Sequence, residues 1–223
     1  MQFIGQRIFP AATPVDREII EALRPIATPH LSDNLSRSVG IVGLTRYSRR
    51  GKLLGTAFTV KTRPGDNVYI YKALTMLQPG HVLVVDLGGD TNNAVIGELM
   101  KLYAEQRGCA GFVVNGAIRD VATFEKGEFP CYARGNTHRG PYKSGPGEIN
   151  VPVAVGGQVI EPGDVLVGDE DGIVSFPRDI AGELIAKARE TAACEDAIKA
   201  EIATGNPEQS WIAKALAHSC IDS

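Results

Sequence analysis

An arginine and an aspartate stand next to each other at Arg119-Asp120, shortly after the hydrophobic run of residues 111–114. A short run of β-forming residues predicts a buried strand, here ending at Asn115-Gly116. Polar residues just past the carboxyl end of such a strand commonly bind ligands in α/β sheets. An aspartate offers oxygen to Mg²⁺ or Mn²⁺, and an arginine offers a fork of donors to a carboxylate or a developing enolate. The pair therefore suits a small anionic substrate chelated to a metal. The alternative is an ordinary surface ion pair, so neighbouring segments must decide.

A second strand is predicted over residues 81–86, and Gly88-Gly89-Asp90 follows it. Residues 94–104 carry apolar side chains at helical spacing, which predicts a helix with Gly97-Glu98 in or near its start. Backbone N–H groups at a helix N-terminus bind carboxylates well. We therefore expect the two glycine-bearing loops to meet over one pocket.

These segments resemble the RraA-like family, which includes regulators of ribonuclease E activity. The resemblance lies in Gly-Gly-Asp at 88–90, Gly-Glu-Leu-Met at 97–100, twenty residues between Glu98 and Arg119-Asp120, and Tyr-Ala-Arg-Gly at 132–135. It extends from about Thr28 to near Ala200. Within the family the chain looks most like the 4-hydroxy-4-methyl-2-oxoglutarate/4-carboxy-4-hydroxy-2-oxoadipate aldolases, which are class II pyruvate aldolases. The fold implied is an α/β protein, a swivelling β/β/α sandwich with N- and C-terminal helices.

The resemblance also implies roles for particular residues. Asp120 would bind a divalent cation, Mg²⁺ or Mn²⁺, directly, and Arg119 would contact the pyruvyl moiety of the substrate. Glu98 would contact water on the metal, and the aldolases commonly carry aspartate at its position. The extra methylene of Glu98 therefore puts the substrate and the rate in question more than the reaction class. The substrate-binding loop would comprise Gly97, Glu98, Leu99 and Met100.

A further acidic residue is implied near the C-terminus, because the aldolases have a glutamate in a C-terminal helix that reaches the metal waters of a neighbouring subunit. Glu195 is the best positional match, with Glu190 in reserve. The alternative is that these glutamates belong to a solvated helix face. A shared site would require a homo-oligomer, and the resemblance implies a homotrimer or a homohexamer.

The activity implied is cleavage of a 4-hydroxy-2-oxo acid to pyruvate and a second oxo acid, with oxaloacetate decarboxylation as a side activity. The main alternative is a noncatalytic regulator that binds a protein partner, such as ribonuclease E, through the same scaffold. Fold resemblance alone does not separate the two. A methyltransferase ranks last, because the chain has no glycine-rich nucleotide loop.

Composition excludes several other classes. The 223 residues carry a net charge of −3, which argues against nucleic acid as a direct partner. No run is long enough to span a bilayer and the amino terminus lacks a signal-peptide core, so we expect no membrane association and a cytoplasmic location. The four cysteines and four histidines show neither zinc nor disulfide spacing.

The remaining elements complete a single domain over residues 1–223, with residues 201–223 as a helical tail. Helical patterns cover residues 16–23 and 181–200, and Trp211 belongs to a short tail helix. A capped turn at 28–35 leads into a second helix, residues 55–62 alternate as a strand does, and residues 169–172 form a hairpin turn. The Gly- and Pro-rich segment 135–157 is expected to pack at a subunit contact.

Overall fold

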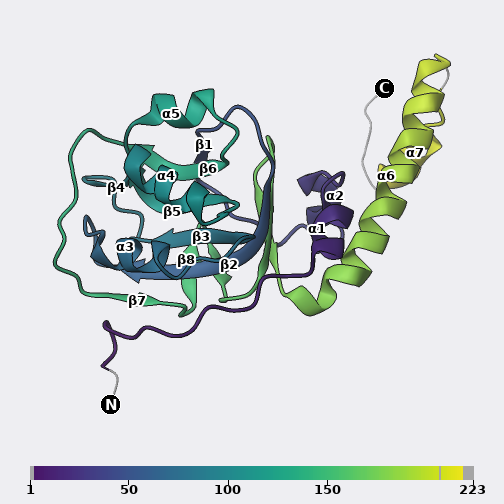
Figure 1. Ribbon diagram of the computed structural model, residues 1–223. Coiled ribbons are helices and arrows are strands. Elements are labelled where there is room, and N and C mark those ends of the chain that lie inside the picture. The colour runs from purple at the N-terminus through teal and green to yellow at the C-terminus, as the bar shows by residue number, and fades with distance from the viewer. Residues whose placement is uncertain (1–2, 206, 218–223) are drawn as a thin grey trace.

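A mixed sheet with helices forms the body of the protein in the computed structural model, which describes residues 3–205 and 207–217 (Figure 1). The α/β class predicted from the sequence is confirmed. Within these residues the sheet has nine strands in the order β1-β6-β5-β3-β2-β10-β11, and β4 and β7 pair with β5 and β2. The strands of this sheet are β1 (Thr45–Arg46), β2 (Leu53–Thr62), β3 (His81–Asp86), β4 (Ala94–Ile96), β5 (Gly111–Ile118), β6 (Cys131–Asn136), β7 (Gly147–Ile149), β10 (Val165–Gly168) and β11 (Ile173–Phe176).

Four parallel strands, β2, β3, β5 and β6, form the centre of the sheet. Parallel strands are normally buried on both faces, because helical crossovers cover them. Strand β2 follows this rule, since Lys61 is its one exposed residue. The expectation of alternating burial over residues 55–62 was therefore wrong, although the strand itself is present.

Two layers cover the faces of the sheet. On one face, Phe58, Leu83 and Phe112 pack with residues of three helices, α3 (Val68–Leu74), α4 (Glu98–Gln106) and α5 (Val121–Lys126). On the other face, a separate hairpin of β8 (Val153–Val155) and β9 (Gln158–Ile160) packs on Val84 and Val113. Both layers lie over the central strands, so polar groups can gather only where those strands end.

A third cluster joins the far edge of the sheet to the terminal helices. Residues of β10 and β11 pack there with α1 (Arg17–Leu23), α2 (Thr28–Asp33) and α6 (Ala181–Ala203), which a short 3₁₀ turn (Arg178–Ile180) precedes. Beyond this contact α6 and α7 (Ser210–Ala215) extend away from the body (Figure 1). No helix in the described ranges combines the length and apolar character needed to cross a bilayer.

The hairpin turn at 169–172 is confirmed, because β10 and β11 pair antiparallel across it. The tail helix around Trp211 is also present, as α7. The helix predicted over residues 181–200 is α6, and it continues three residues further, to Ala203. The predicted tail at 201–223 therefore begins inside α6. Residues 206 and 218–223 of that tail lie outside the described residues.

Three boundaries near the predicted site differ from expectation. The strand predicted to end at Asn115-Gly116 continues to Ile118 as β5. It can do so because the Asn115 amide donates to Asp86 Oδ1 at 2.9 Å, and because Gly116 leaves room for Leu87. Residues 94–96 form β4 rather than the first turn of a helix, since they pair with the end of β5. The helix α4 begins only at Glu98.

At the amino terminus, residues 28–33 are themselves the helix α2 rather than a turn that leads into one. Pro29 explains the start, because proline is well accommodated in the first turn of a helix. The Gly- and Pro-rich segment 135–157 contributes the end of β6 and the strands β7 and β8. Its packing at a subunit contact stays a prediction.

Candidate active site

Arg119 and Asp120 lie directly after the last residue of β5, as the sequence predicts. The Arg119 backbone N–H donates to Ile96 O at 2.9 Å, which joins this loop to the end of β4. Asp120 is the residue before α5 and has φ 56° and ψ 39°, a left-handed conformation. Aspartate and asparagine accept this conformation more readily than most residues. The turn directs the Asp120 side chain back towards the start of α4.

The Asp120 carboxylate is held at the amino end of α4. Its Oδ2 atom accepts a hydrogen bond of 3.0 Å from Glu98 N and lies 3.8 Å from Arg119 Nε. A Cβ atom at Gly97 would stand 2.5 Å from the same oxygen, so only glycine permits this approach. Both the Arg119 and the Asp120 side chains remain nearly half exposed, at 45% and 46%. They are therefore accessible to a ligand.

The first turn of α4 provides further donors. The first four N–H groups of a helix have no partner within it. Of these, Glu98 N donates to Asp120, whereas Lys101 N makes the first bond of the helix, to Gly97 O at 3.1 Å. Within the described chain the N–H groups of Leu99 and Met100 have no such acceptor. This end of α4 can therefore bind an anionic group.

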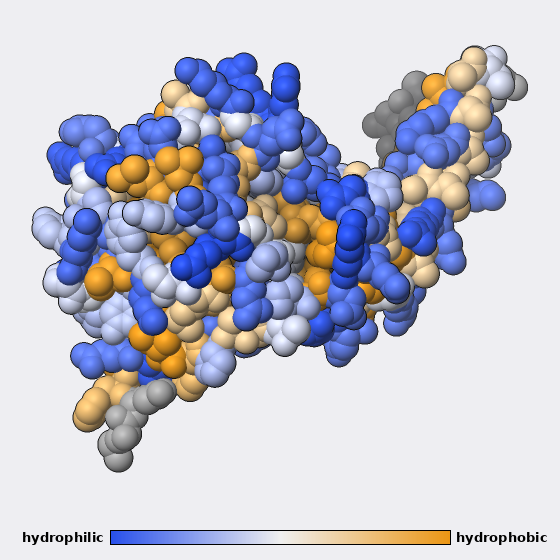
Figure 2. Space-filling view, viewed as in Figure 1, coloured by the Kyte–Doolittle hydropathy of each residue, from blue (hydrophilic) through white to orange (hydrophobic). Residues whose placement is uncertain are grey.

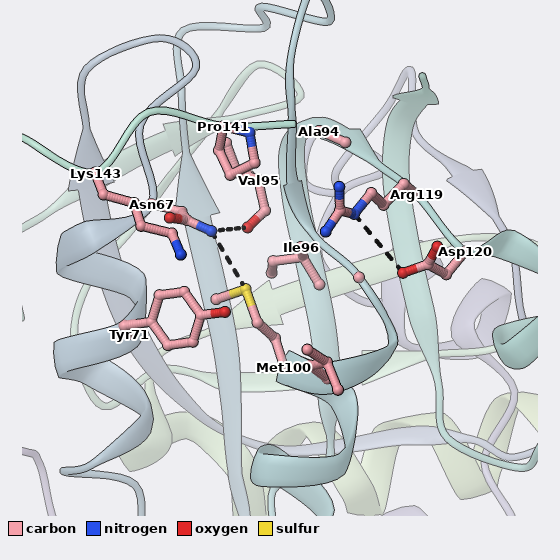
Figure 3. Close-up of a pocket in the computed structure, with 12 residues that line it drawn as sticks. Asn67, Tyr71, Ala94, Val95, Ile96, Met100, Arg119, Asp120, Pro141 and Lys143 are labelled. Carbon is pink, nitrogen blue, oxygen red and sulfur yellow. Dashed lines mark hydrogen bonds and ion pairs between the residues drawn. The ribbon is translucent and has the colours of Figure 1, made fainter. Parts of the chain in front are cut away.

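A small pocket of about 70 Å³ opens where these groups meet (Figure 3). Figure 3 shows the Arg119 guanidinium pointing into it from one side, with Asp120 behind. The predicted residues Gly97, Leu99, Met100, Arg119 and Asp120 all line it. Its other lining residues are Asn67, Tyr71, Ala94, Val95, Ile96, Pro141 and Lys143.

Glu98 lies on the other side of Asp120, outside this pocket. It lines a wide, open cleft together with Asp120, Thr123 and Lys126. Its Oε1 atom accepts a hydrogen bond of 3.3 Å from Thr123 Oγ1. Asp120 lines both the pocket and this cleft, so Glu98 lies next to a residue of the pocket but does not line the pocket itself.

Glu195 lies far from this region of the same chain. It is on α6, where its Oε2 atom lies 2.9 Å from His30 Nε2 of α2 and 3.9 Å from Lys199 Nζ. Helix α6 packs against α1 and α2, at the opposite end of the body from α4 and α5 (Figure 1). Glu190 is exposed on the same helix. The structure of one chain thus does not bring either glutamate to Asp120, and a role for them in a neighbour's site stays a prediction.

The donor set limits how a metal can bind. No group of three His, Cys, Asp or Glu side chains gathers anywhere in the described residues. Asp120 Oδ2 is engaged, whereas Oδ1 accepts no hydrogen bond within the described chain. One carboxylate with a free oxygen suits Mg²⁺, which usually keeps several waters and binds proteins through one or two carboxylates plus the substrate. It does not suit a structural zinc site, which needs four protein ligands.

Sequence reasoning missed the far wall of the pocket, formed by Asn67, Tyr71 and Lys143. Asn67 follows β2, so the rule that identified Arg119-Asp120 could have found it at the same edge of the sheet. Lys143 had no local signal, because it comes from the Gly- and Pro-rich segment. The loop at Gly88-Gly89 was expected at the pocket but does not line it; Gly89 instead lies against Arg134.

Other reactive side chains near the sheet serve the fold. His81 is buried, and its two ring nitrogens bond to Gln78 N and Ala12 O at 3.0 and 2.8 Å. Burial lowers the pKa of His81, which the bond to Ala12 only partly offsets. Burial raises the pKa of the Cys109 thiol to about 11, so it is neither a thiolate nucleophile nor a ready metal ligand.

Comparison with known proteins identifies the fold. Residues 28–175 match the RraA-like family (Aldolase/RraA). A protein of Halalkalibacterium halodurans named "Putative 4-hydroxy-4-methyl-2-oxoglutarate aldolase" is 37% identical over 184 residues, covering 81% of this chain and 86% of that protein. One of the same name from Ectopseudomonas mendocina is 33% identical over 156 residues, covering 69% and 96%.

A solved structure from Streptomyces coelicolor, described as an unusual member of the RNase ES inhibitor RraA protein family, superimposes with a TM-score of 0.75. The two chains are 28% identical, and the match covers 83% of this chain and 97% of the other. The predicted family and its fold are thereby confirmed, while the relatives' names include both an aldolase and an inhibitor. The chain belongs to the RraA-like family.

Proposed function

We propose that the protein is a divalent-metal-dependent aldolase that cleaves a 4-hydroxy-2-oxo acid to pyruvate and a second oxo acid. The observation that carries this proposal is the meeting of Arg119, Asp120 and the amino end of α4 in one pocket. The aldolase names of the two relatives support the reaction class.

The amino end of α4 would bind the carboxylate of the 2-oxo acid. The free N–H groups of Leu99 and Met100 donate to it, and the helix dipole favours negative charge at this end. Gly97 keeps the backbone open there. This arrangement fixes the pyruvyl end of the substrate next to Arg119.

Carbon–carbon cleavage leaves an electron pair on the pyruvyl fragment as an enolate. Arg119 would donate a charge-assisted hydrogen bond where the enolate oxygen develops, a contribution of roughly 3 kcal/mol to the transition state. Asp120 would hold Mg²⁺ or Mn²⁺ through its free Oδ1. Bound there, the cation supplies Lewis-acid stabilisation to the chelated 2-oxo acid. Oxaloacetate would lose carbon dioxide through the same enolate, which explains the proposed side activity.

The proton of the 4-hydroxyl group must also leave, and no side chain of the pocket is an evident base. We assign this role to a water that the metal would hold and that Glu195 of a neighbouring subunit would contact, which makes the active enzyme a homo-oligomer, a trimer or hexamer. Exposed apolar side chains favour such assembly. Figure 2 shows an orange patch over α4, where Leu99 and Leu102 are 65% and 49% exposed, and Ile198 and Ile202 are exposed on α6.

Subunit mixing tests the shared site. Asp120→Ala and Glu195→Ala proteins are each expected to be inactive, and mixing them should restore part of the activity, because some interfaces then pair an intact Asp120 with an intact Glu195. A tagged-subunit pull-down establishes that subunits exchange. Exchange without recovered turnover, or full activity of Glu195→Ala alone, would exclude the shared site.

The reaction itself is tested by measuring pyruvate release from several 4-hydroxy-2-oxo acids with Mg²⁺, with Mn²⁺ and with a chelator. We expect turnover with either metal and its loss on chelation. The inhibitor name of the Streptomyces coelicolor relative favours a second candidate, a noncatalytic regulator that binds a ribonuclease. Absence of pyruvate from every substrate, together with binding to ribonuclease E, would establish the regulator and refute the aldolase.

A further inference from the structure

The enolate that cleavage leaves in the pocket must take up a proton at C3, the later methyl carbon, before it becomes pyruvate. Arg119 faces the enolate oxygen, and its guanidinium group does not give up a proton in proteins. Asp120 would be ionised and would hold the cation. A further group must therefore lie near C3 if the enzyme itself supplies this proton.

The pocket contains few groups that can donate a proton. Four of the residues that line it have titratable side chains, namely Tyr71, Arg119, Asp120 and Lys143. Figure 3 shows Tyr71 and Lys143 across the pocket from Arg119. The pocket measures only about 70 Å³, so a small fragment bound by Arg119 also lies close to the opposite wall. The candidates for the donor to C3 are therefore Tyr71 and Lys143.

Tyr71 directs its hydroxyl group into the pocket. The residue belongs to α3 and is half-buried, and Figure 3 shows the hydroxyl pointing inward beside Met100. In the described chain the hydroxyl groups of Tyr47 and Tyr132 donate to acceptors at 3.2 and 2.7 Å, whereas that of Tyr71 has no such acceptor. A phenol in this state cannot act as the base for the 4-hydroxyl group, but its proton is available to a ligand.

Lys143 supports Tyr71 as the donor. Its Nζ atom lies 5.3 Å from the centre of the Tyr71 ring, and among the described residues no carboxylate lies within ion-pairing distance of it. When Tyr71 gives up its proton, the phenolate that remains is attracted by this ammonium group. If Lys143 donated instead, the pocket would lose a charge that attracts the anionic fragment. The ammonium therefore stabilises the product of proton transfer from Tyr71.

We propose that Tyr71 is a catalytic residue that donates a proton to C3 of the enolate. The phenolic O–H bond breaks, and the electron pair of the C2–C3 double bond forms the new C3–H bond. A lone pair of the enolate oxygen re-forms the carbonyl group at C2, and the phenolate then takes a proton from water. In the reverse direction the phenolate removes a proton from the methyl group of pyruvate. This inference rests on the proposed aldolase function, whose last step it describes.

Exchange of the methyl protons of pyruvate with D₂O tests this step, because it needs no 4-hydroxy-2-oxo acid. Proton NMR measures the exchange rate in the presence of Mg²⁺. General acid–base catalysis contributes about 100-fold or more, so Tyr71→Phe should exchange about 100-fold more slowly than the wild type. Tyr103→Phe removes the same hydroxyl group from an exposed tyrosine outside the pocket and should exchange at the wild-type rate. A wild-type rate in Tyr71→Phe would refute the proposal.

Binding separates a chemical role of Tyr71 from a structural one. Phenylalanine keeps the ring, so calorimetric binding of pyruvate with Mg²⁺ should stay within about twofold of the wild type, and thermal unfolding should not change. Equal losses of binding and exchange would mean that Tyr71 only shapes the pocket. Slow exchange in Lys143→Met with normal exchange in Tyr71→Phe would make Lys143 the donor. Either result refutes the proposal.

The exchange assay also separates this inference from the proposed function. Exchange that depends on Tyr71 supports the proton transfer even if no 4-hydroxy-2-oxo acid is cleaved, a result that would refute the aldolase. Cleavage of such acids, with normal pyruvate exchange in Tyr71→Phe, refutes the inference and leaves the aldolase standing. A wild-type protein that exchanges no pyruvate protons with Mg²⁺ or Mn²⁺ also refutes the inference, and pyruvate release then decides the aldolase by itself.

Discussion

Two aspartates in loops after parallel strands, Asp66 after β2 and Asp120 after β5, show how the same group can serve the fold or a ligand. The Asp66 side chain is fully buried, and it accepts backbone hydrogen bonds from Val68, Ser144 and Gly145. Asp120 is nearly half exposed and accepts a single backbone hydrogen bond, from Glu98.

The difference lies in how many lone pairs remain available. A carboxylate has about four acceptor sites, and backbone donors occupy three of those on Asp66. Asp120 keeps one oxygen free within the described chain. A saturated carboxylate joins two segments of the fold, whereas a half-saturated one is positioned and still able to bind. Exposure and hydrogen-bond count, rather than residue type, therefore distinguish the candidate ligand.

The largest expected effect is that of Asp120→Asn. Asparagine tolerates the left-handed backbone at this position and can still accept from Glu98 N, so the fold should be kept. It lacks the charge that would hold the cation, whose stabilisation is worth several kcal/mol, so kcat/KM should fall roughly 1,000-fold. Pyruvate release across a Mg²⁺ titration measures this, with thermal unfolding as the control. Normal turnover at low Mg²⁺ would show that Asp120 is not the ligand.

Arg119→Lys should have the next largest effect. A lysine keeps the charge but replaces the planar fork by a point ammonium, so kcat should fall about 100-fold if Arg119 stabilises the enolate. Steady-state kinetics at saturating substrate separates kcat from KM. Kinetics close to the wild type would remove Arg119 from the chemistry.

Asp66→Asn should lower stability rather than impair the chemical step. Replacing one acceptor oxygen by an amide leaves backbone donors of the loop without a partner, at a cost of about 2 kcal/mol. Thermal unfolding should then shift down by roughly 4–8 °C. A variant as stable as the wild type would contradict the assignment of Asp66 to the fold.

The same variant has an expected pH signature. Burial raises the pKa of Asp66, but the backbone donors and Arg63 outweigh it, so the pKa is lowered in the folded state. A lowered pKa gives stability that is complete above the unfolded value of about 3.9 and is lost as pH falls through the folded value. The difference in the free energy of unfolding between the wild type and Asp66→Asn should therefore shrink as pH falls below about 4. Urea unfolding of both proteins over this pH range measures it.

Gly97→Ala should have the smallest effect. The added methyl group would stand 2.5 Å from Asp120 Oδ2, and overpacking of this kind costs about 1–3 kcal/mol. The carboxylate can shift to relieve it, so we expect kcat/KM to fall about tenfold with little change in melting temperature. Gly182→Ala, where a methyl group meets no neighbour within 4 Å, is the matched control and should keep full activity. Equal activity in both variants would mean that the close approach at Gly97 is not needed.

The sequence by itself determined one wall of the pocket. The hydrophobic run that leads into Arg119-Asp120 and the apolar spacing after Gly97 are local signals, because strand and helix formation depend on near neighbours. They placed Arg119 and Asp120 at the carboxyl end of a buried strand. The family resemblance added the loop from Gly97 to Met100, and the structure brings Gly97, Leu99 and Met100, though not Glu98, to the same pocket. The motif spacing also indicated the family correctly.

Only the tertiary structure decided where strands continue and which distant residues meet. Residues 94–96 became β4, because pairing with the end of β5 outweighed their helical spacing. Lys143 and Asn67 line the same pocket because Asp66, the neighbour of Asn67, accepts hydrogen bonds from Ser144 N and Gly145 N. These bonds connect positions more than 70 residues apart along the chain. In the same way, Glu195 meets His30 across a helix pair. Such contacts depend on how packed layers fit, which no local pattern of residues encodes.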